Sequence, residues 1–130
     1  MSSDIPTAEA EEKSMKGKLL LSIDDIQVEV DWEENESVAA LRELVAFNPF
    51  PIQMSMYGGF EQVGSIGQSI VRNDKQIKTS YGDIVLYSGD QIVIFYGSNS
   101  WSYTRLGHID LTQQEMKDLL GGGDVSITLQ

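Results

Sequence analysis

The chain of 130 residues contains no cysteine and one histidine, His108. Without cysteine, disulfide bonds, thiolate metal ligands and a cysteine nucleophile are excluded. With one imidazole, a metal site built from several histidines is also excluded within a single chain. The sequence has no nucleophile–base pair and no phosphate-binding loop either, so we expect no catalytic residue, no metal and no cofactor.

Positive charge is scarce, because 9 Lys and Arg stand against 20 Asp and Glu and give a formal net charge of −11. Nucleic-acid binding depends on cationic side chains that neutralise phosphates, so this balance argues against nucleic acid and against an anionic membrane surface. No stretch approaches the roughly 20 apolar residues of a membrane-spanning helix. The partners that remain are a peptide or a small-molecule ligand, and we expect a monomer.

Large apolar side chains are nearly absent from residues 1–17, where Ser, Ala, Glu and Lys dominate. This composition predicts a disordered N-terminal tail or linker, since the segment has no apolar face to bury. The compartment stays open, because a cytoplasmic protein and an exported one tethered after removal of a signal segment both fit. Residues 18–130 are expected to form one domain, since the chain is too short for two ordinary ones.

Two short apolar runs, residues 84–87 and 91–96, are rich in β-branched and aromatic side chains. The turn sequence Ser-Gly-Asp separates them, so the pattern predicts a β-hairpin with Ile94 in the core. Apolar alternation over residues 19–23 and 26–32, on either side of two aspartates, predicts a second strand pair with Val28 facing inward.

Two helices are predicted from apolar spacing and capping residues. Residues 37–46 carry apolar side chains at three- and four-residue spacing, with Asn35 or Ser37 as the cap. Residues 112–120 begin with a capping box, in which a threonine is followed three positions later by a glutamate.

The remaining segments are predicted as short strands and loops. Strands are expected at residues 52–57, 104–109 and 125–129, and loops at residues 60–70 and 98–103. Many strands with only two helices favour a mainly β fold, a closed antiparallel β-barrel of about eight strands with two flanking helices.

Three segments resemble a bacterial family of small cyclophilin-like domains. They are Met-Ser-Met-Tyr-Gly-Gly-Phe-Glu-Gln-Val-Gly at residues 54–64, Gly-Asp-Ile-Val-Leu-Tyr at residues 82–87, and Ile-Phe-Tyr-Gly at residues 94–97 continued by Tyr-Thr-Arg-Leu-Gly-His-Ile at residues 103–109. The order of the predicted elements is also that of the cyclophilin fold. The resemblance covers roughly residues 18–130 and implies a cyclophilin-like fold rather than an activity.

Authentic cyclophilins isomerise X–Pro bonds, and the resemblance raises the question of whether this chain does the same. Their strand after the first helix carries Phe-His-Arg, followed by Phe-Met-x-Gln-Gly-Gly, and the arginine stabilises the twisted imide. The matching stretch here, residues 52–62, contains neither His nor Arg. The resemblance therefore implies a binding module for a peptide or a small ligand, without efficient prolyl isomerase activity. The alternative is a weak or divergent peptidyl-prolyl cis–trans isomerase.

Aromatic residues are the leading candidates for a binding site. Trp101 and Tyr103 stand in a polar segment, and in cyclophilins the corresponding loop supplies an aromatic wall of the proline pocket. The other interpretation of Trp101 is that it covers the rim of the barrel. Tyr57, Phe60 and Gln62 are candidates for the same groove, against packing in the core or anchoring of a loop.

Arg72 and Arg105 are candidates for the position that the missing arginine leaves vacant. The competing interpretation is that each is a surface residue paired with one of the many carboxylates. His108, with no second histidine nearby, is predicted to be a structural or surface residue.

Overall fold

The structure is a computed structural model that describes residues 18–130. The tail or linker expected at residues 1–17 lies outside the described residues. The elements follow in chain order: β1 (Leu21–Ile23), β2 (Ile26–Val28), β3 (Val30–Trp32), α2 (Glu36–Leu44), β4 (Phe50–Gln53), β5 (Ser55–Tyr57), β6 (Glu61–Ser65), β7 (Lys75–Lys78), β8 (Asp83–Tyr87), β9 (Gln91–Phe95), β10 (Ser100–Ile109), α3 (Gln113–Leu120) and β11 (Ser126–Leu129).

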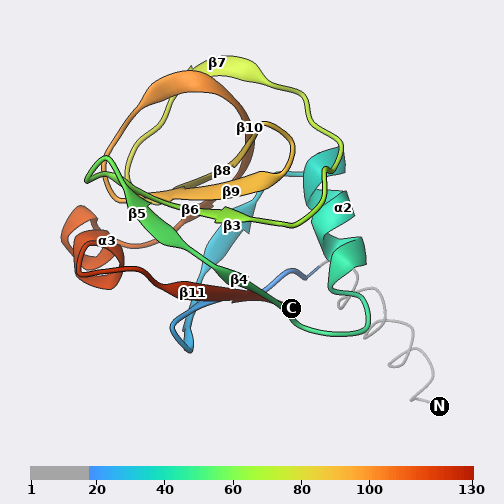
Figure 1. Cartoon of the computed structure of the whole chain (residues 1–130), viewed down its shortest axis with the longest axis horizontal. Helices are drawn as coiled ribbons and strands as arrows, with labels where there is room; N and C mark the ends of the chain where they lie inside the picture. Colours follow the sequence, from blue (N-terminus) through green and yellow to red (C-terminus); the bar gives the residue numbers. More distant parts are fainter. Residues whose placement is uncertain (1–17) are drawn as a thin grey trace.

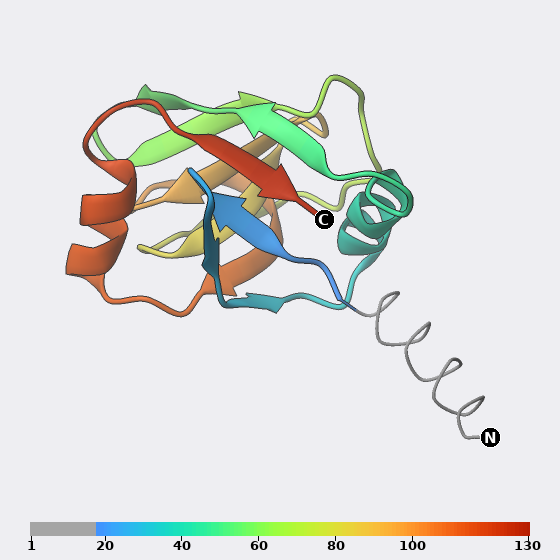
Figure 2. The same cartoon turned by 90° about the horizontal axis from the view of Figure 1, so that it is seen from below.

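The strands form two antiparallel sheets (Figure 1). The smaller sheet has the order β2-β1-β11-β4, and Figure 2 shows β11 running between β1 and β4. The larger sheet has the order β3-β10-β8-β9-β6-β5, with β7 paired to β10. Within residues 18–130, the mainly β, antiparallel fold with two helices is therefore confirmed.

The closed barrel of about eight strands is not confirmed, because neither sheet formed by residues 18–130 closes on itself. The chain passes from one sheet to the other at two places where a single residue interrupts a strand. Glu29 separates β2 from β3, and Met54 separates β4 from β5. The predicted continuous strands at residues 26–32 and 52–57 are each divided at these points, because pairing changes from one sheet to the other.

The β8–β9 hairpin is buried on both faces, which explains why its two apolar runs do not alternate with polar residues. Ile94 and its neighbours on the same face join the main core between the sheets and the helices. Val85, Val93 and Phe95 point to the opposite face, because side chains alternate along a strand. There they form a second apolar cluster with Tyr103. This second cluster forms the floor of the candidate site.

Both predicted helices are present, at opposite ends of the body in Figure 1. The Val38 N–H donates to Asn35 Oδ1 at 2.9 Å, so Asn35 caps α2, which ends two residues earlier than predicted. Helix α3 begins with the predicted capping box of Thr112 and Glu115. No helix within the described part of the chain is both long enough and apolar enough to cross a membrane.

Three sequence predictions about strands were wrong. The segment predicted as a loop at residues 60–70 contains β6, the loop at residues 98–103 contains the start of β10, and β7 was not predicted. One inward-facing position is also less buried than expected, since Val28 is only partly buried. It lies on β2, a strand at the edge of a sheet, which is covered from one side only.

Candidate binding groove

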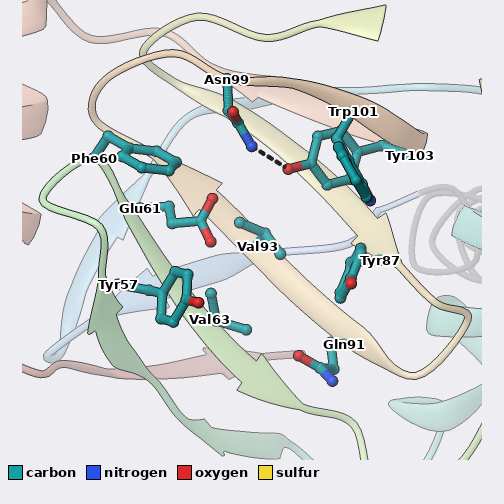
Figure 3. A pocket seen from close by; sticks show the side chains of 10 residues that line it. All are labelled: Tyr57, Phe60, Glu61, Val63, Tyr87, Gln91, Val93, Asn99, Trp101 and Tyr103. Carbon is teal, nitrogen blue, oxygen red and sulfur yellow. Dashed lines mark hydrogen bonds between the residues drawn. The ribbon is translucent and has the colours of Figure 1, made fainter. Parts of the chain in front are cut away.

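A groove of about 600 Å³ lies over the second apolar cluster, on the face of the larger sheet that is turned away from the main core. In Figure 1, β7 and the first half of β10 arch over β8 and β9 on this side. The groove is lined by side chains from β5, β6, β8, β9 and β10 and from the adjoining turns, shown in Figure 3: Tyr57, Phe60, Glu61, Val63, Tyr87, Gln91, Val93, Asn99, Trp101 and Tyr103.

Phe60 is fixed at one end of the groove by the turn between β5 and β6. Its carbonyl accepts hydrogen bonds from the N–H groups of Tyr96 at 2.9 Å and Gly97 at 3.0 Å. A Cβ atom on Gly97 would lie 2.7 Å from the Cβ of Phe60, so only glycine permits this approach. The Phe60 ring stacks on Phe95, with ring centroids 6.4 Å apart and planes 8° from parallel.

The opposite wall of the groove comes from β10 and from Asn99, the residue just before it. Asn99, Trp101 and Tyr103 are two residues apart and line the same groove, as the alternation of a strand requires. Tyr103 is buried and makes an edge contact with Phe95, with ring centroids 5.7 Å apart. Trp101 pairs with Ile77 of β7 and keeps 55% of its surface exposed. Trp101 is therefore the side chain of this wall that is most open to a ligand.

Asn99 positions the hydroxyl group of Tyr103. The Asn99 side-chain amide donates to that hydroxyl at 2.9 Å. The Asn99 backbone is held in turn by Thr79, because its N–H donates to Thr79 Oγ1 at 3.0 Å and its carbonyl accepts from that hydroxyl at 2.9 Å. Burial raises the pKa of Tyr103, the bond from Asn99 opposes this, and the charge of Glu61 adds to the rise. Tyr103 therefore remains a neutral phenol at physiological pH.

Glu61 is the functional candidate that the sequence analysis missed. Its residue is 7% exposed, and its Oε1 atom has no hydrogen-bond partner within residues 18–130. In the strand register Glu61 lies opposite Phe95 on β9 and opposite Tyr57 on β5, which places these side chains on one face. Figure 3 shows the carboxyl group of Glu61 between Phe60, Tyr57 and Val93. Burial raises the pKa of Glu61 from 4.5 to about 7.

Four of the predicted site residues meet in this groove: Tyr57, Phe60, Trp101 and Tyr103. Gln62 does not, because it points to the other face of β6 and is fully buried. Its side-chain amide donates to the carbonyls of Leu120 at 2.8 Å and Gly123 at 2.7 Å, so it binds the end of α3. The interpretation of Gln62 as a core-packing residue fits this placement.

Arg72 and Arg105 do not share the groove with Phe60 and Trp101. They line a separate pocket of about 350 Å³ beside the start of α2. The Nε atom of Arg72 lies 3.6 Å from Asp74 Oδ2, and the Nη1 atom of Arg105 lies 3.1 Å from Asp83 Oδ1. Each arginine is thus paired with a carboxylate, as the competing interpretation expected.

The single histidine also contacts Asp83. The Nδ1 atom of His108 lies 2.8 Å from Asp83 Oδ1, and His108 is largely exposed on β10. Within residues 18–130 there is no cluster of three or more acidic or histidine side chains that could hold a metal ion. The groove itself offers aromatic surface, tyrosine hydroxyl groups, one buried carboxyl group and the side-chain amides of Gln91 and Asn99.

The model of a family described as the cyclophilin-like family matches residues 21–130. The match spans both sheets, both helices and every side chain that lines the groove. A search of curated proteins finds no match to this chain.

Proposed function

Since this chain belongs to the cyclophilin-like family, we propose that it is a binding module that holds a peptide or a small ligand in the aromatic groove. The observation that carries this proposal is Trp101, which stands half-exposed at a cavity of about 600 Å³. Ligand sites typically have volumes of about 300–1,000 Å³ and mostly apolar walls with a few polar groups. The groove meets both criteria.

The fixed positions of the wall residues also support binding. Phe60 is held by two backbone hydrogen bonds, and Tyr103 by Asn99 and by its contacts with other rings. A ligand that enters such a groove loses less free energy to the ordering of side chains than it would on a mobile surface. Trp101 adds a large amphipathic surface of the kind that dominates many binding sites.

The same proposal holds that the domain is not an efficient prolyl isomerase. Catalysis of imide rotation requires a preorganised donor aimed at the twisting bond, across a barrier of roughly 20 kcal/mol. Residues 52–62 supply no arginine or histidine, and Arg72 and Arg105 are paired with aspartates outside the groove. Binding, by contrast, needs only a concave surface that excludes water.

Binding is tested by titrating the domain with proline-containing peptides while the indole N–H signals are followed by NMR. The Trp101 signal should shift, and the Trp32 signal should not, because the Trp32 indole N–H donates to the Leu19 carbonyl at 2.6 Å outside the groove. Trp101→Ala, which lacks this reporter and is therefore titrated by calorimetry, should weaken binding by roughly tenfold or more. Phe47→Ala, which removes an exposed aromatic outside the groove, should leave the affinity unchanged. If no peptide and no small-molecule library shifts the Trp101 signal, the proposal is wrong.

The absence of efficient isomerase activity is tested by a protease-coupled assay on a proline peptide. The rate of cis–trans isomerisation should stay close to the uncatalysed one. A clear acceleration that is lost in Trp101→Ala would favour the alternative, a weak or divergent prolyl isomerase.

A further inference from the structure

The groove contains one ionisable group that carries charge near neutral pH. Among its ten lining residues, Glu61 is the one with a formally charged side chain, and neither Lys, Arg nor His is present. Only 7% of the surface of Glu61 is exposed, and its Oε1 atom has no hydrogen-bond partner among the described residues. A buried acceptor without a hydrogen bond is unfavourable, and such groups in native proteins are few. A donor brought by a ligand would satisfy this acceptor.

The surroundings of Glu61 favour a positively charged donor. The rings of Tyr57 and Phe60 lie beside the carboxyl group, and Trp101 closes the far wall (Figure 3). Aromatic faces attract cations through the ring quadrupole, Trp most strongly. An anionic group would meet a buried carboxylate and an overall charge of −11. A cation, in contrast, is drawn toward the protein by the same field.

We propose that the groove recognises a cationic group, an alkylammonium or a guanidinium, with Glu61 as its counter-ion and the rings of Tyr57, Phe60 and Trp101 as its walls. This inference rests on the proposed binding function and names the chemistry of the ligand. A lysine or arginine side chain of a peptide and a free small amine share that chemistry.

The opposite possibility is that Glu61 is protonated and donates to a neutral carbonyl group of the ligand. Burial raises its pKa to about 7, so both protonation states are accessible. The two possibilities predict opposite effects of pH. A cation binds the ionised carboxylate, so its affinity should rise with pH and fall about tenfold per unit below the pKa. A carbonyl ligand needs the protonated form, so its affinity should fall as the pH rises through 7.

The other titratable groups around Glu61 do not change their charge between pH 5 and pH 8, so they do not affect the pH dependence of ligand affinity. Tyr57 on β5, Tyr87 on β8 and Tyr103 on β10 share the groove, and Tyr96 follows β9. Tyrosine hydroxyls are uncharged near neutral pH. Burial and the charge of Glu61 raise the pKa of Tyr96 and Tyr103 further. A change in affinity between pH 5 and pH 8 that disappears in a Glu61 variant therefore reports on Glu61.

The experiment compares acetyl-Ala-Arg-Pro-Ala-amide with the same peptide carrying citrulline, the neutral analogue of arginine. n-Butylguanidinium serves as the free small cation, and binding is read from the Trp101 indole signal at pH 5 to 8. The arginine peptide should bind roughly tenfold more tightly than the citrulline peptide at pH 8. Glu61→Gln should remove this preference and the pH dependence. Glu33→Gln removes the same charge from an exposed residue outside the groove and should change neither.

Binding of n-butylguanidinium that depends on Glu61 and is at least as tight as that of the arginine peptide would support a free small cation as the ligand. Binding of the arginine peptide alone would support a peptide. Equal binding of the arginine and citrulline peptides, or an affinity that falls with rising pH, overturns the cationic ligand but leaves the binding module intact. If none of the probes shifts the Trp101 indole signal, both proposals are wrong.

Discussion

At the scale of single residues, the carboxyl group of Glu61 has a pKa of about 7 in the folded domain, against an ordinary value of 4.5. Between these two values the folded state holds a proton that the unfolded state has released. The free energy of unfolding should therefore decrease as the pH rises from 4.5 to 7, by roughly 1 kcal/mol per unit and roughly 3 kcal/mol in all. Above pH 7 this contribution is constant.

The variant Glu61→Gln isolates this effect, since glutamine resembles the protonated carboxyl group. Urea unfolding should show a difference near zero between variant and wild type at pH 4.5 and a more stable variant, by about 2–3 kcal/mol, at pH 8. The matched variant Glu33→Gln, at an exposed carboxylate, should stay within about 0.5 kcal/mol at both pH values. A Glu61→Gln variant that is equally destabilised at both would mean that the carboxyl group is satisfied by a partner in the folded state.

At the scale of single elements, strand β9 separates the two apolar clusters. Its residues should therefore contribute more to the free energy of unfolding than those of edge strands. Ile94 is fully buried in the main core, so Ile94→Ala should lower the free energy of unfolding by about 2–5 kcal/mol through lost burial and a cavity. Ile26 on edge strand β2 is 54% exposed, and Ile26→Ala should cost less than about 1 kcal/mol. Chemical denaturation of both variants checks which face of β9 points into the main core. A loss below about 1 kcal/mol for Ile94→Ala would reverse that assignment.

Helix α3 is attached to β6 through Gln62. The variant Gln62→Ala leaves the carbonyls of Leu120 and Gly123 without this donor, and should destabilise the domain by about 1–3 kcal/mol. Gln114→Ala, on the exposed side of the same helix, should have an effect within about 0.5 kcal/mol. Equal effects in thermal melts of the two variants would show that Gln62 does not hold the helix.

The elements that the sequence predicts well are those whose signals are local. The β8–β9 hairpin has its own turn residues, and α3 has both parts of its capping box within four positions. Strand β6 lacks such a signal, because it contains Glu61, Gln62 and Gly64 in place of apolar alternation. Gly64 is required by tertiary packing, since a Cβ atom there would clash with the sulfur of Met54 and the carbonyl of Gln53. This close approach of β6 to the end of β4 is set by the fold, and no local pattern reveals it.

At the scale of the whole molecule, the same distinction between local signals and long-range packing decides which residues of the groove the sequence predicts. Trp101 could be identified because it is an aromatic residue amid small polar ones, and Phe60 because its segment resembles the cyclophilin-like family. Glu61 could not be identified from the sequence, because its burial results from the meeting of β5, β9 and β10 around it. The role of Arg105 also depends on a distant carboxylate, because its partner Asp83 lies 22 positions away, whereas Arg72 pairs with Asp74 only two positions along the chain.

The long strand β10 has two halves with different neighbours, and this difference predicts which half opens more readily. Residues 104–109 pair with β8 and β3, whereas residues 100–103 pair with β7, itself paired to no other strand of the described chain. Two-stranded ribbons are marginally stable by themselves. Amide hydrogens at residues 75–78 and 100–103 should therefore exchange with deuterium through local opening, while those at residues 104–109 exchange only when the whole domain unfolds. A ligand bound against Trp101 should slow exchange in the first set and leave the order of exchange rates within the second set unchanged. Residues 100–103 are thus the part of β10 whose local opening a bound ligand would suppress.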